Sequence, residues 1–319
     1  MFGGLFKKPD KYTLKHLQTL YTQLVKSKPG VKSGDAALID TVKQISELMV
    51  YGDQNNDRFF EFFCEKNMMG ALVEVMQHTR STAVKVQIIQ TVSILMQNIN
   101  SERSLFYMLS NNHVNTLITH SSDPSDEELL AYYISFLKTL SQHLNATTVH
   151  FFFNSGLRAN KFPLYAEAIK LFRHEEGMVR IAVRTITLNV YKVKDDGMRE
   201  YVCSGPEAHY PTFLALYLRA EILKLNAIIT AGDGSRLSQV PDMLQNQLDH
   251  VYYIEDIFLA DIPALSEALC DALVNHVVQP LLLHSLLVVG GVEVAVDTSL
   301  SMFLLAQLFR VTTYPPLLS

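Results

Sequence analysis

Cysteine and histidine are the side chains of this chain best suited to nucleophilic or metal chemistry, and both are widely scattered. The three cysteines, Cys64, Cys203 and Cys270, lie in apolar or helical stretches with no histidine paired to them in the sequence. Three scattered thiols are too few for a disulfide framework or a Cys-rich zinc site. The cysteines therefore predict neither a catalytic nucleophile nor a zinc site, and they favour a reducing compartment.

The histidines form no metal-binding motif. Among the 11 in the chain, the H-E-x-x-H spacing of zinc proteases does not occur. The nearest cluster, residues 173–176 (RHEE), falls between two expected helices, where a solvated junction is the main interpretation and a metal-ligand set is the alternative. His276 and His284 are eight residues apart amid aliphatic residues, too far for ligands on adjacent turns, and we interpret them as core histidines.

Other possible chemical motifs have structural explanations. Residues 232–235 (GDGS) are interpreted as a flexible turn, because no strand precedes them and no Gly-Lys-Ser/Thr follows. Asp123, Asp126, Glu127 and Glu128 suit the start of a helix, with a catalytic pair as the alternative. No G-x-S-x-G elbow occurs. We therefore expect no enzyme, no catalytic residue, no cofactor and no metal site.

Composition predicts an ordered protein that does not bind nucleic acid. Hydrophobic residues make up 48% of the chain, and its net charge of -5 leaves no basic stripe for a phosphate backbone. The first residues lack the features of a signal peptide. Residues 273–296 are apolar enough to suggest a membrane span, but polar residues and Pro280 interrupt them. A buried helix is the main interpretation and a membrane-inserted segment the alternative, and we expect a cytoplasmic protein.

A unit of two apolar segments recurs along the chain, with residues 59–76 and 83–99 in one unit and residues 104–120 and 128–144 in the next. Periods of ~40 to 47 residues characterise HEAT and armadillo arrays, whose units stack to bury their apolar faces. We therefore predict an all-α, armadillo/HEAT-like helical solenoid of elongated shape. The equivalent apolar positions are 45 residues apart, as in Met69 and Val114, Leu72 and Leu117, Ile89 and Ile134, and Val92 and Leu137.

The third unit contains KFPLYAEAIKLF (residues 161–172), in the place that residues 67–76 and 112–120 hold in the earlier units. Pro163 suits the first turn of a helix and holds Phe162 extended. Leu164 begins an apolar stripe at i, i+4, i+7 and i+8. We interpret Phe162, Pro163 and Leu164 as a structural element with Phe162 buried, and not as a chemical site.

Register is lost after this unit. A fourth unit begins at Met198, and longer helices are expected around residues 244–258, 263–289 and 299–311. We predict an armadillo-like repeat region over residues 1–226 and a continuation of the helical array over residues 227–319. The final residues show no obvious polar capping helix, which solenoids normally need, so truncation at the C-terminus is expected.

Two polar features are candidates for recognition. Arg180 and Arg184 lie one turn apart on an expected helix, and they are interpreted either as solvated or as possible contacts to an acidic partner. Asn189 shares the inward face of that helix, and we expect it to bond the backbone of a neighbouring repeat. Residues 51–60 (YGDQNNDRFF) are expected to form a polar loop after the second helix, where a turn is the main interpretation.

These stretches together resemble the FPL-domain family of membrane-trafficking proteins. The tripeptide that names the family stands here as Phe162-Pro163-Leu164, and YGDQNND, EFFCEKNMM, LSNNHVNTLI, DEELLAYYISFLKTLS, LYAEAIKLF and MVRIAVRTITLNVYKV are similar to its N-terminal region. Weaker similarity runs on from LDHVYYIEDIF to SLSMFLLAQLF, so the resemblance covers nearly the whole chain. Family members generally carry a long C-terminal portion that these residues do not include.

The resemblance implies a non-enzymatic helical scaffold or adaptor in endosome-to-lysosome (vacuole) trafficking and in autophagy, including mitophagy. The implied partners are trafficking proteins, with small Rab GTPases and ubiquitin ligase machinery among them. The implied location is the cytoplasm, peripherally on endosomal, lysosomal or autophagic membranes. The alternatives are a Rab regulator with exchange-type activity, which leaves no motif, and a ubiquitin ligase component, although neither a RING-type zinc site nor a catalytic cysteine is visible.

Overall fold

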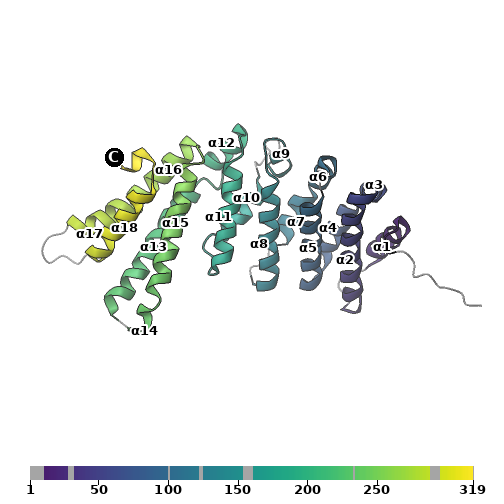
Figure 1. The fold of residues 1–319 in the computed structure, drawn as a ribbon, viewed down its shortest axis with the longest axis horizontal. Helices are drawn as coiled ribbons and strands as arrows, with labels where there is room; N and C mark the ends of the chain where they lie inside the picture. Colours follow the sequence, from purple (N-terminus) through teal and green to yellow (C-terminus); the bar gives the residue numbers. More distant parts are fainter. Residues whose placement is uncertain are drawn as a thin grey trace, which may run out of the picture. The chain divides into compact units, whose positions relative to one another are not determined.

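The chain folds into stacked α-helices (Figure 1). The computed structural model describes residues 11–27, 32–99, 101–121, 125–153, 161–232, 234–287 and 295–318. Over these ranges the secondary structure is helical, and no strand occurs among them. The predicted all-α, armadillo/HEAT-like helical solenoid is therefore confirmed.

The chain forms two compact units, Met1–Asn189 and Val190–Ser319. The division falls inside helix α11 (Gly177–Tyr191), near its last turn. The division predicted at residues 226 and 227 rests on loss of the sequence repeat, which is a different criterion, and it stays a prediction.

The first unit is built from helix triplets. Two helices, α1 and α2, come before the triplets, and the third helix of each triplet occupies the place that α2 holds in the first pair. The bounds are α1 (Leu14–Lys26), α2 (Lys32–Asn55), α3 (Arg58–Glu65), α4 (Met68–His78), α5 (Thr82–Asn98), α6 (Glu102–Leu109), α7 (His113–His120), α8 (Glu127–Gln142), α9 (Val149–Phe152), α10 (Pro163–Lys170) and α11.

Equivalent helices stack on one another in two rows (Figure 1). One row contains α1, α4, α7 and α10, and the other contains α2, α5 and α8. The predicted placement of residues 161–172 is confirmed, because α10 packs on α7 as α7 packs on α4. The apolar positions spaced 45 residues apart are all buried, since the stacked rows enclose them from both sides.

In the first two triplets, a left-handed asparagine separates the first helix from the second. Asn67 precedes α4 with a φ of 47°, and Asn112 precedes α7 with a φ of 60°. Asparagine adopts this backbone region at lower cost than most residues, so the chain turns sharply there. The side chain of Asn67 also links two repeats, because its Oδ1 lies 3.0 Å from Nε2 of His113. The first apolar segment of each unit, residues 59–76 and 104–120, is thus two helices, whereas the second segment is one helix.

The predicted loop at residues 51–60 is mostly helical. Helix α2 continues to Asn55, and only Asn56 and Asp57 separate it from α3. The reason is close packing at Gly52, where an added Cβ would lie 2.4 Å from Cβ of Phe59. Gly52 therefore lets α3 fold back against α2, and its role here is close approach between helices and not a turn.

In the second unit, α13 is the central helix and packs against α15, α16 and a π-helical segment, η1. Helix α18 packs against η1, α15 and α17. The bounds are α12 (Asp196–Ser204), α13 (Tyr210–Ala231), α14 (Gly234–Leu237), α15 (Val240–Phe258), α16 (Pro263–Leu273), η1 (Val274–Leu283), α17 (His284–Leu287), α18 (Thr298–Val311) and α19 (Pro315–Leu318).

Pro280 lies inside η1 and explains a bond between helices. Proline has no N–H, so the carbonyl of His276, four residues earlier, loses its α-helical donor. Arg219 on α13 donates to that carbonyl oxygen, with its Nη1 2.8 Å away. The π-helix was not predicted, because periodicity alone does not distinguish it from an α-helix.

The interpretation of His276 and His284 as core histidines is wrong. His284 is exposed and His276 is half-buried, because the wider turns of η1 shift these positions away from the core. The core histidine of this unit is His250, which is 3% exposed and whose Nε2 lies 3.2 Å from the carbonyl oxygen of Leu214. Among the described residues, no helix has the length and apolar character of a membrane span.

Candidate functional site on the α2 and α5 faces

The Phe162-Pro163-Leu164 motif lies at the start of α10. Phe162 is 1% exposed, which confirms its predicted burial, and its ring centroid is 6.0 Å from that of Phe153. Its carbonyl oxygen accepts a hydrogen bond from Ala166 N at 2.9 Å, so Phe162 also supports the first turn. Pro163 is the first helical residue, and Leu164 is fully buried. These contacts are those of a helix start in the core.

Arg180 holds the junction that precedes α11. Its Nη1 donates to the carbonyl oxygens of His174 at 2.7 Å and Glu175 at 2.6 Å. The cluster at residues 173–176 is therefore a helix junction that the arginine side chain stabilises. Among the described residues, no group of three His, Cys, Asp or Glu side chains is placed to hold a metal. Arg184 lies one turn further on and is half-buried, and partner binding by the two arginines stays a prediction.

Polar side chains bond neighbouring helices among α5, α8 and α11. Asn189 on α11 donates from Nδ2 to Ser141 Oγ on α8 at 3.0 Å. The expected backbone partner of Asn189 is thus a side-chain hydroxyl, because Ser141 is buried at the same level. Gln97 on α5 makes the equivalent contact to α8, with its Nε2 3.0 Å from Thr139 Oγ1. These bonds join α5 to α8 and α8 to α11.

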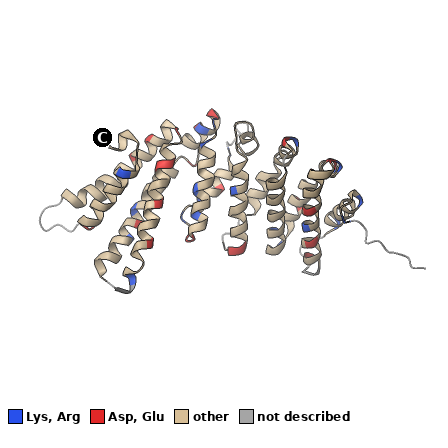
Figure 2. Ribbon diagram, viewed as in Figure 1, with Lys and Arg blue, Asp and Glu red and all other residues tan. Residues whose placement is uncertain are grey.

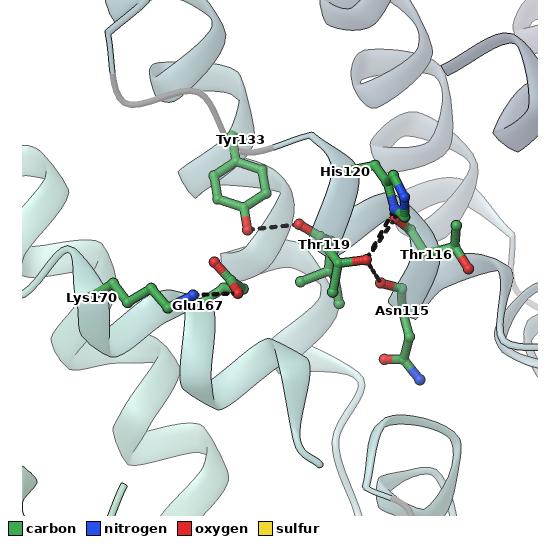
Figure 3. A network of polar contacts seen from close by, with 8 residues as sticks. Asn115, Thr116, Thr119, His120, Tyr133, Glu167 and Lys170 are labelled. Carbon is green, nitrogen blue, oxygen red and sulfur yellow. Dashed lines mark hydrogen bonds and ion pairs between the residues drawn. The ribbon is translucent and has the colours of Figure 1, made fainter. Parts of the chain in front are cut away.

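A second set of polar contacts lies among α7, α8 and α10, with Lys170 and Glu167 paired within α10 (Figure 3). The hydroxyl of Tyr133 on α8 donates to the carbonyl oxygen of Ile118 on α7 at 2.9 Å. Thr119 Oγ1 lies 3.0 Å from the carbonyl oxygen of Asn115, so the end of α7 satisfies its own carbonyls. Because Tyr133 is buried, its bond to α7 stabilises the stack and is not available to a partner.

The candidate site is a groove of about 670 Å³ between α2 and α5. Its walls are equivalent faces of adjacent repeats, because Lys43, Glu47 and Tyr51 on α2 precede their counterparts on α5 by 47 residues. Four of the lining side chains are amides. The lining residues are Tyr12, Lys43, Ser46, Glu47, Val50, Tyr51, Gln54, Gln87, Gln90, Ile94 and Asn98.

Charge is sparse on the α5 wall of the groove. Lys85 is the one Lys, Arg, Asp or Glu in α5, and the α5 ribbon is mostly tan in Figure 2. On the α2 wall, Glu47 forms an ion pair with Lys11, whereas Lys43 is exposed and has no ion pair within the described residues. The groove is therefore a mostly uncharged polar surface with one available ammonium group.

This groove was not predicted from the sequence, although a signal was present. Gln87, Gln90, Ile94 and Asn98 recur at helical spacing on the side of α5 opposite its buried stripe. Exposed amides on a helix are common, so the pattern means little until α2 is placed beside α5. The packing of the two helices supplies that information.

A second groove, of about 570 Å³, lies between α3 and α6 and contains Cys64. Burial raises the pKa of the Cys64 thiol to about 11, with a small opposing effect of Arg103. Burial also raises the pKa of Cys203 and of Cys270. Thiols in such surroundings stay protonated near neutral pH and are poor nucleophiles.

The stacked triplets and their continuous core define an armadillo-like helical-repeat protein. Residues 42–191 match the FPL family, described as an uncharacterised conserved protein, and residues 235–319 match the CLEC16A helical domain. The mouse Protein CLEC16A is 41% identical over 99% of this chain and 31% of its own length.

Relatives in other kingdoms and phyla also match most of the chain. The Drosophila melanogaster Protein CLEC16A homolog is 41% identical over 89% of this chain and 27% of its own length. Protein TRANSPARENT TESTA 9 of Arabidopsis thaliana is 36% identical over 98% of this chain and 38% of its own length. The chain belongs to the FPL-domain family that includes the CLEC16A proteins. It spans about a third of the length of these relatives.

Proposed function

We propose that this chain is a non-enzymatic helical scaffold or adaptor in endosome-to-lysosome (vacuole) trafficking and in autophagy, including mitophagy. It binds trafficking proteins through the surface of its repeats. The observation that carries this proposal is the groove between α2 and α5, which two adjacent repeats form from equivalent faces. A stacked array suits such a role, because its side-by-side helices present a continuous surface to a partner.

Small Rab GTPases and ubiquitin ligase machinery are the proposed partners, and the proposed location is the cytoplasmic side of endosomal, lysosomal or autophagic membranes. Support comes from the chain's family, because the resemblance to that family implies a role in membrane trafficking. Because the chain spans about a third of its relatives, the proposal concerns partners that contact this part.

The test is proximity labelling in cells that express the full chain, combined with delivery of endocytosed cargo to lysosomes. One variant places charge in the groove, Gln90→Asp with Ile94→Asp. Its matched control changes two exposed residues of α1, Gln18→Asp with Gln23→Asp. We expect the groove variant to lose endosomal or autophagic partners and the control to keep them, with both melting at the temperature of the unaltered chain.

A third variant, Arg184→Glu, tests the α11 surface against Arg58→Glu, an exposed arginine on α3. Loss of a partner with Arg184→Glu alone supports a second contact on α11. The scaffold role is contradicted if the unaltered chain labels no endosomal or autophagic protein above background. An exchange activity would replace the scaffold role if the purified chain accelerated nucleotide release from a Rab GTPase.

A further inference from the structure

The amides of the α2–α5 groove are placed to read a peptide main chain. Within the described residues, Gln54 and Gln90 make no hydrogen bond, so both side chains are available to a partner. A primary amide offers two donors and one acceptor, whereas the peptide unit of an extended segment offers one donor and one acceptor. Amides on the two walls can therefore pair with successive peptide units, whatever side chains the segment carries.

The charge of the groove selects one kind of side chain. Glu47 is neutralised by Lys11, and the α5 wall carries no charged lining residue. Lys43 is the remaining charged residue in the lining. Its side chain is exposed, and its ammonium group makes no ion pair in the described part of the chain. Charge complementarity therefore favours a carboxylate at this position.

An apolar contact lies further along α2. Val50 and Tyr51 line the groove with Ile94, which is 40% exposed, and the ring of Tyr12 lies 4.5 Å from that of Tyr51 between centroids. Val50 is seven residues beyond Lys43, which is about 10 Å at a helical rise of 1.5 Å per residue. An extended peptide covers that distance in about three residues at ~3.3 Å each.

We propose that the α2–α5 groove binds an extended peptide segment through its main chain, with an acidic side chain at Lys43 and an apolar side chain against Tyr51 and Ile94, about three residues apart. This inference rests on the proposed scaffold function and names the chemical class of its partner. The amides bind the backbone, Lys43 sets the charge preference, and the aromatic pair sets the apolar one.

The test begins with a phage-displayed library of random 12-residue peptides, selected against the purified full chain. We expect enrichment of sequences with an acidic residue followed about three residues later by a large apolar one. A fluorescent copy of an enriched peptide then gives dissociation constants by anisotropy. Lys43→Glu should weaken it at least tenfold and should improve binding of the same peptide with its acidic residue changed to lysine. The matched control is Lys66→Glu, another exposed lysine.

Gln54→Leu with Gln90→Leu tests main-chain recognition separately. This variant should weaken the acidic peptide and its lysine-substituted copy by the same factor, whereas Gln18→Leu with Gln23→Leu on α1 should change neither. A helical partner would give enriched peptides with apolar residues at i, i+3 and i+4 in place of the extended pattern. That result, no enrichment, or equal binding by the unaltered chain and the Gln54→Leu, Gln90→Leu variant would overturn the inference.

The cellular assay separates this inference from the function on which it rests. If the Lys43→Glu chain labels the same endosomal partners and restores cargo delivery fully, the groove inference fails while the scaffold proposal stands. If peptide binding follows the expected pattern but the unaltered chain labels no trafficking protein, the scaffold proposal fails and the peptide site remains. Melting temperatures equal to that of the unaltered chain are required of every variant.

Discussion

Truncation of Phe162 to alanine tests whether the family's signature residues are architectural. Phe162 is 1% exposed and lies 6.0 and 6.1 Å, between ring centroids, from Phe153 and Tyr165. Truncating a buried phenylalanine typically costs ~3 to 5 kcal/mol of unfolding free energy. In a unit of this size each kcal/mol lowers the melting temperature by ~2 to 4 °C, so Phe162→Ala should lower it by roughly 6 to 20 °C.

The assay is thermal unfolding followed by circular dichroism, together with labelling of each partner in cells. Pro163→Ala is the neighbouring control and should be mild, because the first helical turn accepts either residue. Phe309→Ala is the second control, since that ring is 50% exposed. We expect Phe162→Ala to weaken all partners together, because it destabilises the stack. Full stability with loss of a single partner would refute the architectural role and make the motif a docking site.

Three further predictions concern the polar and ionisable groups. Arg219→Met should cost ~1 to 3 kcal/mol of unfolding free energy in denaturant titrations, and less in a chain that also carries Pro280→Ala; equal costs in both backgrounds would contradict the compensation described for Arg219. Because the pKa of Cys64 is raised to about 11, iodoacetamide should modify it about 100-fold more slowly in the folded than in the urea-unfolded chain near pH 8, as read by peptide mass spectrometry; similar rates would show an accessible thiolate. Burial lowers the pKa of His113, so its uncharged form stabilises the fold above pH about 6.5 and that stability is lost as the pH falls below this value. Melting temperatures across this range should fall less steeply for His113→Gln, and an unchanged slope would assign the acid sensitivity to other groups.

The repeat was predictable because stacking imposes a regular demand on the sequence. Equivalent helices bury equivalent faces, so apolar residues return every 45 positions in the first unit. The burial of Phe162 was predictable for the same reason, because residues 161–172 hold the equivalent place in the third unit. Register was lost beyond Met198, where α13, α15 and η1 pack in a different arrangement and the repeat no longer governs which positions are buried.

Local backbone chemistry limited the remaining predictions. The break before α4 depends on Asn67 adopting a positive φ. An asparagine in an apolar run does not by itself predict that conformation. The helical continuation past Gly52 depends on packing against Phe59, which is a tertiary fact. The error at His284 arose because a period of 3.6 residues was applied across a π-helix.

The groove was not predicted because α2 was not recognised as part of the repeat. Its buried residues Val42, Ile45 and Leu48 precede the equivalent buried residues of α5 by 47 positions, close to the 45 that separate α5 from α8. Once α2 takes that place, Lys43 on α2 and Gln90 on α5 become equivalent surface positions. The 47-residue spacing that buries equivalent faces of α2 and α5 also places their opposite faces side by side. The stacking that stabilises the core therefore also forms a surface for a partner.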